Sequence, residues 1–347
     1  MFFSKICVFT LFCVIFFVSG CSSPEIVRRT LPPEEQQRLD EKASLLAEKL
    51  KAFPVRAVTL ESTRVRQEYA PDLVERIGKM GFNRILLHLL KGEEYDEQLA
   101  AFTGFCTQAG IEVYGSFRQN EIVLRSHPNQ IIRKFFADEE TLSFAVAAVA
   151  GQNRGFPVEQ QLKGFSVAVA PHCFTAQIQE RPYNCPYTWS EKRFGEGLDN
   201  ECLIGYTLQE LEKVDQAVAP LPLMVQIPDF YHDLVKAGKL KKGSMKDFSD
   251  FNGRSHELIL LNSGNKPSEL RERVEQELQD APGNTPVIIA IDMAPHSAVT
   301  KGELRRRDWN DFVRAVGYGA GHYSSFRNFS GIVLGPWFRL EVILEEK

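Results

Sequence analysis

The chain has 347 residues, of which 44% are hydrophobic and 25% are charged, and its formal net charge is −4 at pH 7. This length allows one large domain or two medium-sized ones. The negative charge and the lack of a basic stripe argue against a nucleic-acid-binding protein, because such proteins cluster Lys and Arg to neutralise phosphates.

The N-terminus has the order of an export signal. Lys5 precedes an apolar run that is short for a membrane span, and the sequence VSGC follows it at 18–21. These residues resemble the lipobox of bacterial lipoproteins. The resemblance implies that residues 1–20 are a signal peptide, that Cys21 is acylated and anchors the protein to a membrane, and that Ser22 directs it to the outer membrane. Anchoring would be stable because more than one acyl chain is attached. The alternative is an ordinary signal peptide with a chance cysteine.

The next segment leads into the main domain. Residues 21–33 are polar, end in two prolines and are predicted to form a tether. Across 34–53, apolar residues such as Leu39, Leu46 and Leu50 recur at helical spacing. We expect an amphipathic helix that packs on the domain. A helix lying on the membrane surface is less consistent with its modest apolar face and mixed charges.

From residue 54 to residue 347, strand-like runs alternate with helical ones. The predicted strands are 55–62, 83–90, 111–117, 164–171, 222–228, 256–264, 285–294 and 329–337. The predicted helices are 71–82, 95–110, 138–153, 206–220, 244–253, 266–281 and 305–321. In the helix 206–220, Thr207 and Glu210 have the spacing of a capping box at its start.

This alternation predicts the fold class. The strands are rich in leucine and β-branched residues and lack period-two alternation, which is typical of parallel strands buried on both faces. Eight such units predict a (β/α)8 TIM barrel over residues 54–347. A doubly wound sheet is the alternative, but it would often carry a glycine-rich phosphate loop after its first strand, and the sequence TLESTRVRQ at 59–67 is not one.

Polar and aromatic side chains follow the predicted strands, where barrel enzymes build their active sites. These residues are Glu61, His88, Arg118, Glu121, His172, Asp229, Asn262, Asp292, His296 and Trp337. Together they would suit a carbohydrate or another small polar ligand, because amides, carboxylates and histidines bind hydroxyl groups while an indole stacks on a sugar's C–H face. Other roles remain open: an ion pair of Glu61 with Arg64 or Arg84, a core position for His88, packing for Trp337, and turn capping for Asp229.

A long connection at 172–205 is predicted to be a binding loop, because connections of this length are generally functional or disordered and this one is rich in aromatics. It carries Cys173, Cys185 and Cys202. One pair of these can form a disulfide in an exported protein, and the sequence does not choose the pair. No close spacing of cysteines or histidines predicts a metal site, and we expect no cofactor.

An acylated, exported barrel with Trp337 at the end of its eighth strand resembles the glycoside-hydrolase-like TIM-barrel lipoproteins of bacteria, over about residues 54–340. The commonest retaining enzymes of this kind carry an acid/base glutamate after strand 4 and a nucleophilic glutamate after strand 7. In this chain strand 4 ends in VAPH, so His172 stands near the place of the first glutamate. Strand 7 offers Asp292 in place of the second.

Three hypotheses follow from this departure. The first is a glycosidase with a shifted carboxylate pair, Glu61 or Glu121 with Asp292, one acting as general acid and the other as nucleophile or base. The second is a carbohydrate-binding barrel without catalysis. The third is a metal-assisted hydrolase that uses His172, Asp229, Asp292 and His296. Converging carboxylates would favour the first hypothesis, and carboxylates held by arginines would favour binding or a structural role.

Overall fold

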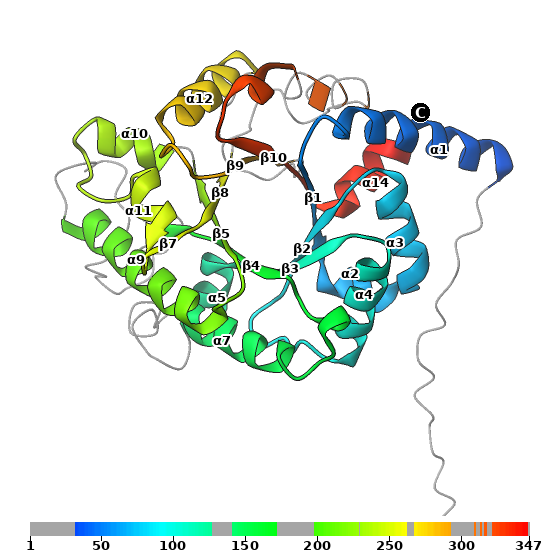
Figure 1. The fold of residues 1–347 in the computed structure, drawn as a ribbon, viewed down its shortest axis with the longest axis horizontal. Coiled ribbons are helices and arrows are strands. Elements are labelled where there is room, and N and C mark those ends of the chain that lie inside the picture. Colours follow the sequence, from blue (N-terminus) through cyan, green and yellow to red (C-terminus); the bar gives the residue numbers. More distant parts are fainter. Residues whose placement is uncertain are drawn as a thin grey trace, which may run out of the picture.

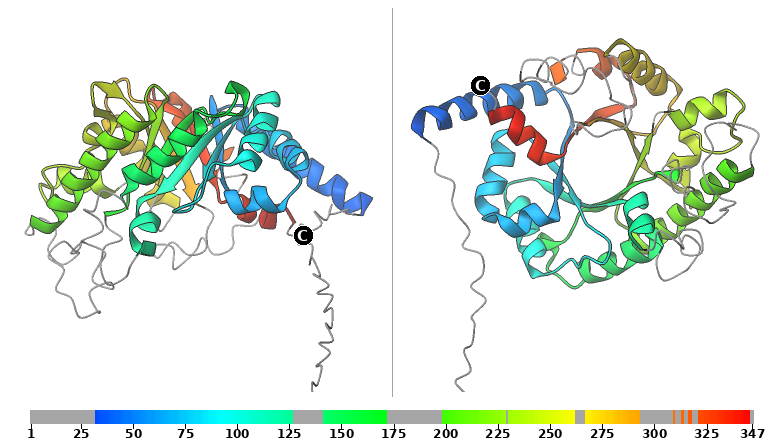
Figure 2. Two further views of the ribbon diagram at one scale, coloured as in Figure 1. Left: turned by 90° about the horizontal axis from the view of Figure 1, so that it is seen from below. Right: turned by 180° about the vertical axis from the view of Figure 1, so that it is seen from behind.

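The computed structural model describes residues 32–126, 141–171, 198–228, 230–261, 267–292, 309, 313, 316–317 and 321–345. Within these residues, eight parallel strands close into a barrel in the order β1-β10-β9-β8-β5-β4-β3-β2 (Figure 1). Helices surround the strands when the barrel is viewed along its axis, from the front and from behind (Figure 2). The predicted (β/α)8 barrel is therefore confirmed.

Each barrel strand overlaps one of the predicted strands. The barrel strands are β1 (Val55–Glu61), β2 (Arg84–His88), β3 (Glu112–Arg118), β4 (Gly164–Ala168), β5 (Leu223–Pro228), β8 (Glu257–Leu261), β9 (Val287–Asp292) and β10 (Phe329–Gly335). The barrel closes where β1 pairs with both β2 and β10. The strands form here because their side chains are apolar on both faces, one facing the barrel interior and the other facing the helices.

The described helices include several that the sequence did not predict. The long ones are α1 (Pro33–Leu50), α3 (Ala70–Lys79), α4 (Glu97–Gln108), α7 (Leu142–Asn153), α9 (Leu198–Val218) and α12 (Pro267–Asp280). The shorter ones are α2 (Ser62–Gln67), α5 (Gln119–Ser126), α10 (Phe230–Lys236), α11 (Met245–Ser249) and α14 (Trp337–Glu345). Of these shorter helices, only α11 overlaps a predicted helix, and the other four were not predicted. The prediction of a helix over 244–253 is corrected, because α11 ends early and the chain continues as the antiparallel pair β6 (Asp250–Phe251) and β7 (Arg254–Ser255).

Helix α9 also corrects the predicted capping box. It begins at Leu198, so Thr207 and Glu210 lie inside the helix and not at its start. The hydroxyl of Thr207 donates to the backbone carbonyl of Leu203 (2.8 Å). The carboxylate of Glu210 accepts from the hydroxyl of Ser143 on α7 (2.7 Å). These residues therefore bond within α9 and between helices, and the long connection predicted over 172–205 ends before α9.

The core has two layers. A small cluster inside the barrel contains Ala57, Leu86, Tyr114, Met224 and residues that face them from the other strands. A larger cluster fills the space between the strands and the helices. Because successive side chains of a strand point to opposite faces, the inner cluster shows which positions of each strand face the barrel interior.

Helix α1 packs against the last helix of the chain. Its residues Ala43, Leu46 and Leu50 are buried, and the helix lies beside α3 and α14 (Figures 1 and 2). Arg38 and Lys42 each donate to one of the last backbone carbonyls of α14 at 2.9 Å, where positive charge is favourable. The apolar face of this helix is thus occupied by the barrel domain. In the described part of the chain, no helix has the length and apolar character needed to span a membrane.

Candidate functional site

Three polar side chains lie next to one another at the carboxyl ends of β1, β2 and β3. Glu61 is paired in register with His88, and His88 is paired with Ser116. Alternation from Ala57, Leu86 and Tyr114 in the inner cluster places all three on the face that lines the barrel. The strand register therefore brings together two residues that the sequence predicted for the site, Glu61 and His88.

Glu121 joins this group from α5, the helix that follows β3. Its Oε2 atom lies 2.8 Å from Nε2 of His88, and Arg118 donates from Nη1 to its Oε1 at 3.1 Å. Burial raises the pKa of Glu121, but the hydrogen bond from His88 and the charges of His88 and Arg118 outweigh it and lower that pKa to about 2. His88, Arg118 and Glu121 therefore form one hydrogen-bonded group, which we call the rim triad.

The rim triad bears on the predicted role of Glu121. A general acid must hold a proton near neutral pH. Glu121 is ionised there, and both of its carboxylate oxygens are already bonded. This arrangement argues against Glu121 as the acid of a glycosidase and gives it the task of holding His88 and Arg118 in place.

The carboxylate of Glu61 differs from that of Glu121 in its surroundings. Its side chain is half-buried, and among the described residues no hydrogen-bond or ion-pair partner is found for its carboxylate. The two arginines considered as partners bind elsewhere: Arg64 bonds to Glu341 at 2.7 Å, and Arg84 bonds to Glu112 at 2.8 Å. The carboxylate of Glu61 therefore stands at the barrel end without a counter-charge from the described structure.

His88 is the most buried member of the site. Only 4% of its surface is exposed, and its Nδ1 atom has no hydrogen-bond partner among the described residues. Leaving a buried polar atom unbonded costs free energy. His88 is thus hydrogen-bonded within the rim triad through Nε2, while its second ring nitrogen, Nδ1, is buried without a hydrogen bond from the described residues.

The sequence did not reveal a polar layer that continues from Ser116 onto β4 and β5. Gln226 of β5 donates from Nε2 to the hydroxyl of Ser166 on β4 (2.8 Å), and Ser116 of β3 lies 3.4 Å from the same nitrogen. All three residues stand within apolar strands. The sequence does carry a signal for this layer. In a strand, a polar residue two positions from one that faces the barrel interior faces the interior as well.

Trp337 requires a correction. It was assigned to the site as a stacking platform for a ligand, with packing as the alternative, and it is fully buried. It begins α14 and packs in the outer core, with the guanidinium of Arg76 5.9 Å from its ring centroid. An indole without exposed surface cannot stack on a sugar, so Trp337 is a packing residue.

For the remaining predicted site residues, the structure describes either nothing or the backbone alone. His172, Asp229, Asn262, His296 and the lipidation residue Cys21 lie outside the described residues, as do Cys173 and Cys185. Nothing is described for the side chain of Cys202, which lies in α9. Among the described residues, no group of three His, Cys, Asp or Glu side chains is placed to hold a metal ion.

Asp292 is described by its backbone alone. It is the last residue of β9, and it pairs with Gly335 of β10. Since β10 lies between β9 and β1, the end of β9 is two strands away from the strand that carries Glu61. Neighbouring strands are about 4.8 Å apart, so β9 and β1 run roughly 10 Å apart.

Comparisons with known proteins give a likeness of fold. No protein-family model and no curated protein match the sequence. Among solved structures, the barrel is similar to a GH18 chitinase from Pseudoalteromonas aurantia, at 11% identity over 84% of this chain and 100% of that chain, with a TM-score of 0.49. It is also similar to a GH10 endoxylanase from a sugarcane soil metagenome, at 11% identity over 84% and 89% of the two chains, with a TM-score of 0.45. A third similar structure is a β-mannanase from the blue mussel Mytilus edulis, at 11% identity over 80% of this chain and 83% of that chain, with a TM-score of 0.41. At these identities the likeness concerns the barrel architecture alone.

Proposed function

We propose that the protein binds a carbohydrate at the carboxyl ends of β1 to β5. The observation that carries this proposal is that Glu61, whose carboxylate has no counter-charge among the described residues, pairs in register with His88, whose Nδ1 has no hydrogen bond there, and both residues are on the face that lines the barrel. A carboxylate and a ring nitrogen pair well with sugar hydroxyls, which both donate and accept hydrogen bonds. Arg118, whose side chain is 43% exposed, adds N–H donors at the same level.

Binding is favoured over turnover by the state of Glu121. One of the three carboxylates considered for catalysis is held by an arginine and a histidine, which suits a fixed recognition surface. Such pre-formed polar groups fix the orientation of a ligand without reacting with it.

Hydrolysis is the second candidate function, and the spacing of the strands favours it. Inverting glycosidases hold their two carboxyl groups about 6.5–9.5 Å apart. Glu61 and Asp292 sit at the ends of strands separated by one strand, β10. In this candidate function, Glu61 and Asp292 supply the acid and the base, and the rim triad orients the sugar.

The test is a screen of the purified protein against a glycan array and a panel of aryl glycosides. Glu61→Gln and Asp292→Asn are screened in parallel, with Glu212→Gln, on the exposed face of α9, as the matched control. Saturable binding that Glu61→Gln weakens and Glu212→Gln retains supports the proposal. Turnover that both Glu61→Gln and Asp292→Asn abolish supports hydrolysis. A glycan bound equally well by Glu61→Gln contradicts the proposed site.

We also propose that the mature protein is an outer-membrane lipoprotein acylated at Cys21. The support is the sequence VSGC at 18–21 after an apolar run. Cells that express the wild-type chain or Cys21→Ser are labelled with an alkyne analogue of palmitate and fractionated. Label in the outer-membrane fraction of the wild type, lost in Cys21→Ser, is the expected result. An unlabelled wild-type protein would contradict acylation.

A further inference from the structure

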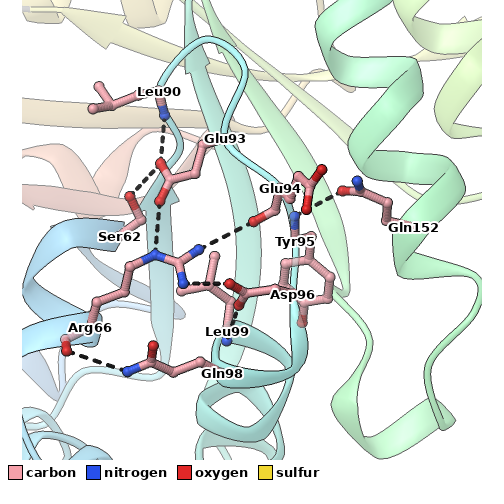
Figure 3. A network of polar contacts seen from close by, with 10 residues as sticks. All are labelled: Ser62, Arg66, Leu90, Glu93, Glu94, Tyr95, Asp96, Gln98, Leu99 and Gln152. Atoms are coloured by element: carbon pink, nitrogen blue, oxygen red, sulfur yellow. Dashed lines mark hydrogen bonds and ion pairs between the residues drawn. The ribbon is translucent and has the colours of Figure 1, made fainter. Parts of the chain in front are cut away.

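A buried polar network joins the two segments that leave β1 and β2 (Figure 3). The carboxylate of Glu93 accepts through Oε2 from the hydroxyl of Ser62 (2.6 Å) and from the backbone N–H of Leu90 (2.9 Å). Ser62 directly follows Glu61, and Leu90 lies two residues after His88. One carboxylate therefore links the backbone next to both residues of the proposed site.

Arg66 extends the network from α2 to the start of α4. It donates from Nε to Glu93 (3.2 Å), from Nη1 to Asp96 (2.5 Å) and from Nη2 to the backbone carbonyl of Glu94 (3.3 Å). Asp96 in turn caps α4 by accepting from the backbone N–H of Leu99 (3.1 Å). Figure 3 shows these side chains converging on the guanidinium of Arg66. The network thus fixes α2, residues 89–96 and α4 relative to one another.

The network is sheltered from solvent on the side of Ser62 and Glu93. Ser62 is 1% exposed and the side chain of Glu93 is 14% exposed, whereas those of Arg66 and Asp96 are 29% and 39% exposed. Hydrogen bonds between charged groups are strong, and burial strengthens them further. The charges here are better placed to fix geometry than those of an exposed ion pair, which contributes little.

Glu61 depends on this network because its carboxylate has no partner of its own among the described residues. Its backbone is held on one side by the pairing with His88 and on the other by the bond between Ser62 and Glu93. His88 is held at Nε2 by Glu121 and through the backbone that leads to Leu90.

We propose that Arg66 and Glu93 are positioning residues that set the placement of Glu61 relative to His88. They touch neither side chain and act through Ser62 and Leu90. The assignment of ligand binding to Glu61 and His88 rests on the proposed function above, whereas the positioning itself is a property of the unliganded protein.

The test compares Arg66→Met and Glu93→Ala with a matched control at another buried ion pair. The control is Arg254→Met, because Arg254 bonds to Asp215 (2.6 Å) and to the backbone carbonyl of Leu221 (2.8 Å), and its exposure of 31% is close to that of Arg66. Arg254 belongs to β7, which precedes β8 and so lies at the opposite end of the barrel from the site. Glu93→Gln is the conservative variant, because its amide oxygen still accepts from Ser62 and Leu90.

The first readout needs no ligand. The chain has 7 histidines, so the Nδ1 and Nε2 resonances of His88 are assignable in a long-range ¹H–¹⁵N spectrum with a His88→Gln variant as reference. Arg66→Met and Glu93→Ala are expected to shift these resonances, Glu93→Gln to restore most of the wild-type shifts, and Arg254→Met to leave them unchanged. Equal shifts in the network and control variants, or shifts in neither, would overturn the proposal.

The second readout is affinity for a glycan identified in the screen. Loss of a ligand hydrogen bond that leaves a buried polar group unpaired costs about 10-fold to 100-fold in affinity, so we expect Arg66→Met and Glu93→Ala to weaken binding by about that factor. Arg254→Met should bind like the wild type. Wild-type affinity in Glu93→Ala would contradict positioning. A wild type that binds no glycan refutes the proposed function alone, because the His88 resonances still decide the positioning.

Discussion

The rim triad makes a testable contribution to stability through Glu121. The substitution Glu121→Gln keeps the shape of the side chain and removes its charge, which leaves His88 and Arg118 without their anionic partner. The pKa of Glu121 falls from its ordinary value of 4.5 to about 2 in the folded protein. A difference of that size corresponds to about 3 kcal/mol, at about 1.4 kcal/mol for each pH unit. The side chain of Arg118 is 43% exposed, so solvent screens its share and we expect a loss of about 2 kcal/mol near neutral pH.

The sign of the pH dependence follows from the lowered pKa. A carboxylate with a lower pKa in the folded state stabilises the protein fully above its unfolded value, here 4.5, and ceases to do so as the pH falls towards 2. Urea unfolding of the wild type and of Glu121→Gln should therefore differ most at pH 6 and converge as the pH is lowered towards 2.5. Glu212→Gln, with an exposed side chain, serves as the control. A difference in unfolding free energy that stays constant over this range would refute the ion-pair explanation.

Three further predictions concern the core, a buried histidine and a strand contact. Trp337→Ala should lower the unfolding free energy by about 3–5 kcal/mol because the indole is fully buried, and a small loss in urea unfolding would contradict its place in the core. Burial lowers the pKa of His256 despite the opposing charge of Asp215, so the unfolded state gains the proton first and stability should fall as the pH drops below about 6.5. His256→Phe should remove this part of the pH dependence, measured by thermal unfolding between pH 7.5 and 5. Gly331→Ala should prevent folding, because a Cβ there would overlap the carbonyl oxygen of Val55, and a soluble variant with the wild-type melting temperature would contradict the register of β1 and β10.

The barrel could be predicted because each of its strands is recognisable from its own local sequence. β9 and β5 read VIIAID and LMVQIP, runs without alternation that only a strand covered on both faces can bury. The glycines Gly81 and Gly110, which follow α3 and α4, adopt positive φ, as the residue that ends a helix commonly does. Both signals lie within a few residues of the element they define, so no knowledge of distant contacts was needed.

The errors arose where a distant contact decided the structure. Thr207 and Glu210 have the letters of a capping box, but Glu210 bonds to Ser143 on α7, 67 residues away. The short helices after β1 and β3 begin at the next residue, and only Pro336 separates β10 from α14, so no loop divides the two patterns. Local propensity is a weak guide when tertiary packing competes with it.

For the site, the sequence indicated which residues reach the barrel end but not how they are bonded. Glu61, His88 and Glu121 were all predicted, yet only the fold shows that Glu121 binds His88 across 33 residues and that Glu61 has no partner among the described residues. The position of Trp337 in the sequence likewise did not determine its orientation. A residue just past a strand end can turn its ring towards the ligand or into the outer core. Pairing and burial depend on three-dimensional neighbours, which single-residue patterns do not encode.

The charges and apolar surfaces at the barrel end narrow the class of ligand. Arg118 is already compensated by Glu121, whereas Glu61 has no counter-charge among the described residues, so an anionic ligand would meet uncompensated repulsion. On the inner face of β8, Leu261 is apolar, and Ala290 and Val333 are apolar on β9 and β10, two residues below the strand-end pair Asp292 and Gly335. A neutral sugar meets both conditions, because its hydroxyl groups can bond to the polar side while its C–H face packs on the apolar side.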